Sequence, residues 1–258
     1  MRIAAAFVAV SLAALPSRAA DLTPLEAQGA IVYDRYCVGC HGAQGDGRGP
    51  AAPVLITQPR DFTSGVFKFR TTPSGALPTD DDLFRVITRG VYRTSMPEWS
   101  LLAERERWAL VAYVKRFYPE WSERGAGKAI AVPAAPDWLG DADAVARGKE
   151  LYALLECTAC HGESGRGDGA SAATLPPDAW GHPQRPFDFT KGRLKSGAAP
   201  EDIYRTFMTG VNGTAMPTYY DIFAAPDGEN IRDDDAWRLV AYILSLRAPE
   251  PAAKGATP

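Results

Sequence analysis

Residues 37–49 read CVGCHGAQGDGRG, and residues 157–169 read CTACHGESGRGDG. In each stretch two cysteines flank a two-residue gap, a histidine follows the second cysteine, and glycine then recurs at matching positions. The two stretches contain all four cysteines of the 258-residue chain. This pattern predicts that the two halves of the chain bind the same kind of group, and it leaves no cysteine for a disulfide.

The spacing Cys-x-x-Cys-His is the one that attaches haem covalently. Its two thiols bond the haem vinyl groups, and the histidine that follows can reach the iron from one side. We therefore expect two covalently attached haem c groups, one on Cys37 and Cys40 and one on Cys157 and Cys160. A zinc site would need more soft ligands, and a thioredoxin-like redox pair would need a βαβ context that the Gly/Pro-rich flanks do not favour.

The chain is an internal duplication, and its register extends well beyond the two motifs. Met96 follows His41 by 55 residues, and Met216 follows His161 by 55 residues. Each methionine precedes a proline, and the second half has nine extra residues around position 226. Two equivalent domains are therefore expected. The other matched segments are 61–63 with 188–190, 83–85 with 203–205, Gly90 with Gly210, and 108–113 with 237–242.

The N-terminal segment has the features of a secretory signal. A short basic start precedes an apolar, alanine-rich run, and small residues follow at the positions that cleavage needs. The run is shorter than the roughly 20 residues required to span a bilayer. We expect residues 1–19 to be a signal peptide cleaved near Ala19, with export to the periplasm and no transmembrane segment after cleavage.

The remaining chain divides into two domains and a linker. We expect the first domain over residues 21–126, a Pro-rich linker over 127–137, the second domain over 138–248 and a disordered tail over 249–258. Residues 21–126 hold 13 acidic and 13 basic side chains, whereas residues 127–258 hold 18 acidic and 13 basic ones. A nucleic-acid protein should present a basic face, so nucleic acid is not an expected partner.

Each half is expected to be all-α, with the order helix, long loop, helix, methionine loop, helix. Apolar residues recur at helical period over 104–117 and over 235–246, which predicts a closing helix in each half. Gly29 and Gly148 each lie one helical turn before a tyrosine, and a glycine there lets the closing helix approach closely. The aromatic residues of these helices are expected to form the core.

With these motifs, each half resembles a class I cytochrome c domain, and the resemblance covers residues from about 22 to 247. It implies an all-α fold of two tandem domains. It also implies that His41 and His161 are the proximal iron ligands and that Met96 and Met216 are the distal ones. The chain as a whole is similar to periplasmic dihaem electron carriers.

A count of ligand types agrees with that implication. Beyond the two motif histidines only His182 remains, so bis-histidine ligation at both irons is impossible. Met208 has Thr88 opposite it in the first repeat and is expected to fill the core. Only Met96 and Met216 are equivalent in both halves.

A haem iron with both axial positions filled has no vacancy for oxygen, peroxide or substrate. The favoured function is therefore single-electron transfer between a donor and an acceptor redox protein, with no catalytic residues. Two alternatives stay open: the cytochrome subunit of a periplasmic dehydrogenase or reductase complex, and a dihaem enzyme of the thiosulfate dehydrogenase type. Arginines near the haems could pair with propionates or attract a partner, although a solvated face is the more common outcome. They are Arg85, Arg89 and Arg93 before Met96, and Arg60, Arg70 and Arg185 in the long loops.

Overall fold

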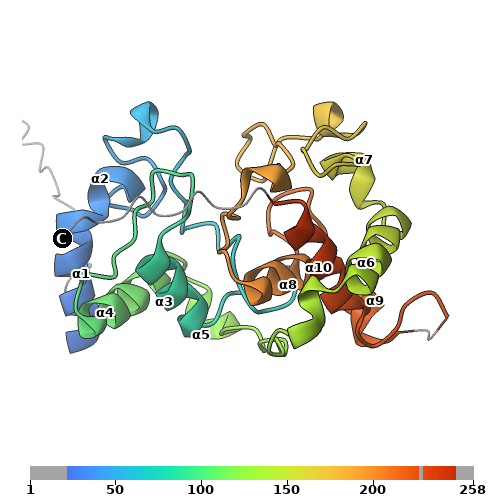
Figure 1. Cartoon of the computed structure of the whole chain (residues 1–258). Coiled ribbons are helices and arrows are strands. Elements are labelled where there is room, and N and C mark those ends of the chain that lie inside the picture. Colours follow the sequence, from blue (N-terminus) through green and yellow to red (C-terminus); the bar gives the residue numbers. More distant parts are fainter. Residues whose placement is uncertain (1–21, 227–228, 248–258) are drawn as a thin grey trace, which may run out of the picture.

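The computed structural model describes residues 22–226 and 229–247, and these fold into two helical halves joined by a short connection (Figure 1). Within the described residues there is no β-strand, and the one isolated bridge joins Leu194 to Gly197. The all-α expectation is confirmed. The predicted signal peptide and the predicted tail fall outside the described residues. Among those that are described, no helix has the length and apolar character needed to cross a membrane.

The helices follow the same order in both halves, apart from one extra short helix after the closing helix of the first half and one before the closing helix of the second. Short 3₁₀ turns cover Ala52–Val54, Asp137–Gly140, Ala172–Thr174 and Phe189–Lys191. The first half contains α1 (Pro24–Tyr36), α2 (Val38–His41), α3 (Asp80–Arg89), α4 (Glu104–Lys115) and α5 (Trp121–Arg124). The second contains α6 (Ala142–Leu154), α7 (Cys157–His161), α8 (Pro200–Thr209), α9 (Tyr220–Ala224) and α10 (Asp235–Ser245).

Glycine lets the first helix of each half cross the closing helix, α4 or α10, in close contact, as predicted. A Cβ on Gly29 would collide with the backbone of Ala109 in α4, and one on Gly148 would collide with the carbonyl of Arg238 in α10. The Cβ atom of Tyr242 would lie only 2.7 Å from the added atom at Gly148. The α1–α4 and α6–α10 pairs therefore form the frame against which each haem motif is held.

Most aromatic residues on these helices pack in or against the core, as predicted, whereas Tyr36 at the end of α1 is 40% exposed. Tyr33 and Tyr113 meet edge to face with centroids 5.4 Å apart, and Tyr152 and Tyr242 do the same at 5.2 Å. Met208 is 3% exposed and belongs to the core of the second half. Each half thus has its own apolar core.

The segment between the halves packs against both of them. The Gly127 amide donates to the Leu77 carbonyl (3.0 Å), and the Ile130 amide donates to the Thr71 carbonyl (2.8 Å). The Ile130 side chain is buried in the apolar cluster of the second half. A segment expected to be a plain linker is therefore part of the contact between the halves.

Candidate haem sites

Both motif histidines are oriented by a backbone carbonyl. The Nδ1 atom of His41 lies 3.0 Å from the Arg60 carbonyl oxygen, and Nδ1 of His161 lies 3.0 Å from the Phe187 carbonyl oxygen. Because a carbonyl can only accept, Nδ1 must carry the proton in each ring. The lone pair of Nε2 is then free to bind a metal, which is the usual arrangement of a metal-ligating histidine.

The surroundings of these rings keep the imidazoles neutral. Burial lowers the pKa of His41, and burial likewise lowers the pKa of His161. His41 stacks on Phe62 with centroids 4.5 Å apart, and His161 stacks on Phe189 at the same distance. Neutral imidazole is the form that ligates iron.

Cys40, Cys157 and Cys160 lie on the motif helices α2 and α7, Cys37 immediately precedes α2, and none of the four forms a disulfide. Burial raises the pKa of Cys37 to about 12 and that of Cys157 to about 11. A catalytic redox pair requires the opposite, a lowered thiol pKa. Among the described residues, no group of three or more His, Cys, Asp and Glu side chains is placed to hold a metal ion. Thioether attachment of haem therefore fits these cysteines better than a redox pair or a zinc site.

The glycines after each motif fold the long loop back over the motif helix. Gly42 and Gly162 have φ values of 77° and 74°, in the region that glycine adopts without strain. The Gly49 amide donates to the Cys40 carbonyl (3.0 Å), and the Gly169 amide donates to the Cys160 carbonyl (3.1 Å). Tyrosine hydroxyls secure the same turns: Tyr33 donates to the Gly42 carbonyl at 2.8 Å, and Tyr152 donates to the Gly162 carbonyl at 2.9 Å.

Met96 and Met216 occupy two loops of the same design. Each loop starts at a glycine with positive φ, 63° at Gly90 and 68° at Gly210. In each, a valine amide donates to the methionine carbonyl at 3.1 Å. A threonine hydroxyl two residues before each methionine accepts the methionine amide, at 3.1 Å for Met96 and 3.2 Å for Met216. Two loops with matching bonds are what a pair of equivalent ligands requires.

The remaining histidine lies elsewhere. His182 is exposed, its amide donates to Asp178 (3.0 Å), and it lines a cavity of about 700 Å³ between the halves. In this cavity the Arg60 guanidinium lies over the Trp180 ring, 3.5 Å from its centroid. Lys68 pairs with Asp178 across the boundary at 3.2 Å. Burial lowers the pKa of Arg60 to about 10, with Asp178 partly opposing that effect.

Two lysines that line this cavity were not predicted from the sequence as site residues. Lys68 follows Arg60 by eight residues, and Lys195 follows Phe187 by eight residues. Arg60 and Phe187 are the residues whose carbonyls accept the histidine bonds. Both lysines line the boundary cavity. Aligning the two long loops on their Asp-Phe-Thr segments would have revealed the match.

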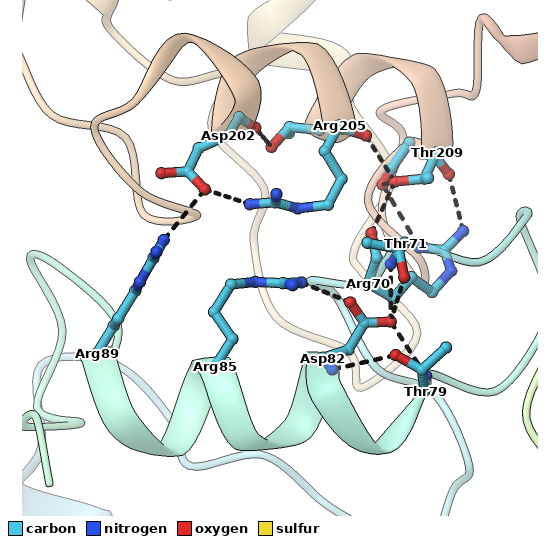
Figure 2. A network of polar contacts seen from close by, with 11 residues as sticks. Arg70, Thr71, Thr79, Asp82, Arg85, Arg89, Asp202, Arg205 and Thr209 are labelled. Atoms are coloured by element: carbon cyan, nitrogen blue, oxygen red, sulfur yellow. Dashed lines mark hydrogen bonds and ion pairs between the residues drawn. The ribbon is translucent and has the colours of Figure 1, made fainter. Parts of the chain in front are cut away.

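The arginines before Met96 do not form one free face. Arg85 pairs with Asp82 of its own helix at 2.5 Å, and Arg89 reaches Asp202 of the second half at 3.4 Å (Figure 2). Helix α3 ends at Arg89, so Arg93 lies beyond it, with a φ of 58°. Of the loop arginines, Arg60 lies at the boundary cavity, Arg185 is exposed, and Arg70 is buried against the second half.

Two family models match the chain, one in each half. Residues 24–114 match the model described as cytochrome c oxidase, cbb3-type, subunit III, and residues 145–247 match the cytochrome c model. A chain from the reducing HAO-like protein complex of Kuenenia stuttgartiensis is 40% identical and superposes with a TM-score of 0.77 over 86% of this chain and 96% of that one. The chain belongs to the c-type cytochromes. This cytochrome consists of two tandem cytochrome c domains and is an electron-transfer protein.

Two curated proteins are also similar to this cytochrome. A thiosulfate dehydrogenase of Stutzerimonas stutzeri is 28% identical over 138 residues, which cover 52% of this chain and 38% of that protein. A cytochrome bc1 complex cytochrome c subunit of Corynebacterium diphtheriae is 26% identical over 240 residues, covering 88% of this chain and 68% of that subunit. The match to the dehydrogenase therefore spans well under half of its length.

Proposed function

We propose that this cytochrome carries single electrons in the periplasm through two covalently bound haems, each ligated by one histidine and one methionine. The observation that carries the proposal is the matched donor set. In both domains Nδ1 of the motif histidine donates its proton to a backbone carbonyl, which leaves the Nε2 lone pair free. In both domains a methionine lies in a loop with the same hydrogen bonds. Bound haem would supply a one-electron iron couple with both axial positions filled.

The protein's own contribution is to hold these ligands still. The carbonyl bonds fix the orientation of the histidine rings, and Phe62 and Phe189 support them by stacking. The threonine and valine bonds fix the methionine loops. A rigid ligand set needs little rearrangement when the charge of the iron changes, and this favours rapid electron exchange. Ligands held on both sides of the iron would also exclude substrate from it.

The cations at the boundary cavity would receive the haem carboxylates. The Arg60 carbonyl accepts the hydrogen bond from His41, so Arg60 lies next to the first haem motif. Lys68 and Lys195 occupy equivalent positions in the two long loops. All three line the cavity. Arg60 and Lys68 are half-buried and Lys195 is exposed. A haem propionate would place a negative charge beside these cations and so favour their position at the cavity.

A subunit role is the second candidate, because the similar proteins include a bc1 complex subunit and a chain of a reducing HAO-like complex. We expect instead that native cytochrome elutes at the mass of a single chain. The measurement is size-exclusion chromatography of fresh host extract followed by haem absorbance and mass spectrometry of this chain. Recovery of the chain only in large assemblies would favour the subunit role.

The purified cytochrome is not expected to oxidise thiosulfate catalytically. With both irons closed, turnover should stay well below about 1 s⁻¹, the lower end of ordinary enzyme rates. The assay follows reduction of an artificial acceptor by thiosulfate, with the haem-loaded protein as the only catalyst. Steady turnover at enzyme-like rates would contradict the carrier proposal and favour a thiosulfate dehydrogenase.

A further inference from the structure

The methionine loop of the second domain begins in contact with the first domain. Helix α8 ends at Thr209, and Gly210 turns the chain into the loop that contains Met216. The last carbonyls of a helix have no partner within the helix and need donors from elsewhere. At α8, Tyr219 and Thr218 of the same domain donate to the Phe207 and Met208 carbonyls. The donors to the Thr209 and Gly210 carbonyls come from the other domain.

Arg70 is the residue that supplies them (Figure 2). Its Nη2 donates to the Thr209 carbonyl at 2.8 Å, and its Nη1 lies 3.4 Å from the Gly210 carbonyl. The Thr209 hydroxyl donates to the Arg205 carbonyl of its own helix at 2.9 Å and lies 3.3 Å from the Arg70 carbonyl. Arg70 is 1% exposed, so the guanidinium is held in place and shielded from water. A cation at a helix C-terminus is favoured by the negative end of the helix dipole.

A second contact holds the loop itself. The side-chain oxygen of Asn212 accepts the Ser74 hydroxyl at 3.2 Å and the Gly75 amide at 3.1 Å. Asn212 is 8% exposed. Residues 70–75 of the first domain thus hold both the start of the loop and a residue four positions before Met216.

Within the part of the chain that the structure describes, the first domain's own methionine loop accepts no matching hydrogen bonds from the second domain. The position that matches Arg70 is Gly197, and the position that matches Asn212 is Tyr92, which is 44% exposed. The second domain reaches this tyrosine through Arg193, whose guanidinium lies 5.1 Å from the ring centroid. Support across the boundary therefore runs mainly in one direction, from the first domain to the second.

We propose that Arg70 and Asn212 are positioning residues through which the first domain sets the placement of Met216 on the second haem. This inference rests on the proposed methionine ligation. Its consequence is that loosening residues 70–75 weakens the distal bond of the second haem and lowers its reduction potential, while the first haem is unaffected.

The test compares Arg70→Met, which keeps length and removes every donor, with Asn212→Ala. Both are made in a Met96→Ala background, where the ferric methionine-to-iron charge-transfer band that remains reports Met216 alone. We expect this band to weaken and the reduction potential of the second haem to fall. Cyanide should bind the second haem about tenfold faster or more, because buried hydrogen bonds to a charged group are lost.

Arg89→Gln is the matched control, because it removes a boundary contact, Arg89 to Asp202, without touching residues 209–216. It should leave the band and the cyanide rate unchanged. If Arg70→Met does not fold, Asn212→Ala decides. An unchanged band and cyanide rate in the folded variants, or an equal change in Arg89→Gln, overturns the inference. Absence of the band from the unsubstituted protein would instead contradict the proposed methionine ligation.

Discussion

Replacing Met96 or Met216 with alanine is expected to open one haem iron while leaving the other closed. The opened iron should bind carbon monoxide when reduced and cyanide when oxidised, because its distal position is vacant. Its reduction potential should fall by on the order of 0.1 V or more, within the roughly 0.8 V over which axial ligands set haem potentials. Spectroelectrochemistry of each variant measures both effects.

Met208→Leu is the matched control for the ligand variants. Met208 is a buried methionine of the same domain as Met216, but it lies in the core on α8. Leucine conserves its volume closely, so the fold should tolerate the change at a cost below about 1.5 kcal/mol. The absorption spectra of both haems should be unchanged in Met208→Leu. A native charge-transfer band of full intensity in either alanine variant would show that the methionine in question is not a ligand.

Much of each domain could be predicted because the information is local or repeated. Helical periodicity placed α4 and α10 within two residues of their ends, and Gly148 identified the crossing of α6 with α10. The Cys-x-x-Cys-His spacing located both motifs, but it did not predict the short helices α2 and α7 that they form. The carbonyl partners of His41 and His161 were beyond prediction, since they depend on how the long loops return to the motif.

The contact between the domains could not be predicted in the same way. Arg70 and Thr209 are 139 positions apart, and neither has a counterpart of the same type in the other repeat. Arg89 lies on a regular helical row with Arg85, yet its partner Asp202 belongs to the other domain. A pattern on one helix shows which residues share a face, but it does not show what that face meets.

The duplication also accounts for how two similar sites can differ in use. The proposed haem ligands and their immediate hydrogen bonds repeat, whereas the residues at the boundary do not: Arg70 is matched by Gly197, and Asn212 by Tyr92. Differences in potential between the two haems are therefore expected to arise from the boundary and not from the ligands. An electron carrier with two unequal haems can pass an electron within itself before releasing it to a partner.

Gly148→Ala is expected to destabilise the second domain, although alanine is intrinsically the better helix former. Within a helix, alanine is favoured over glycine by about 0.5–1 kcal/mol. Here the added Cβ would collide with the Arg238 carbonyl and crowd Tyr242, so α6 and α10 must separate. Overpacking of this kind typically costs about 1–3 kcal/mol and occasionally more, and backbone cannot move aside as a side chain can. We expect a net loss of about 2 kcal/mol in the free energy of unfolding.

Gly140→Ala provides the control, because a Cβ at Gly140 has no atom within 4 Å. Denaturant unfolding of the haem-loaded protein, followed by far-ultraviolet circular dichroism, compares the two variants. The Gly140 variant should match the parent within about 0.5 kcal/mol, the usual range for surface changes. Gly29→Ala should repeat the loss in the first domain, where the Cβ would meet Ala109. If Gly148→Ala proved as stable as the parent, the close crossing of α6 and α10 would not be the frame that holds the second haem motif.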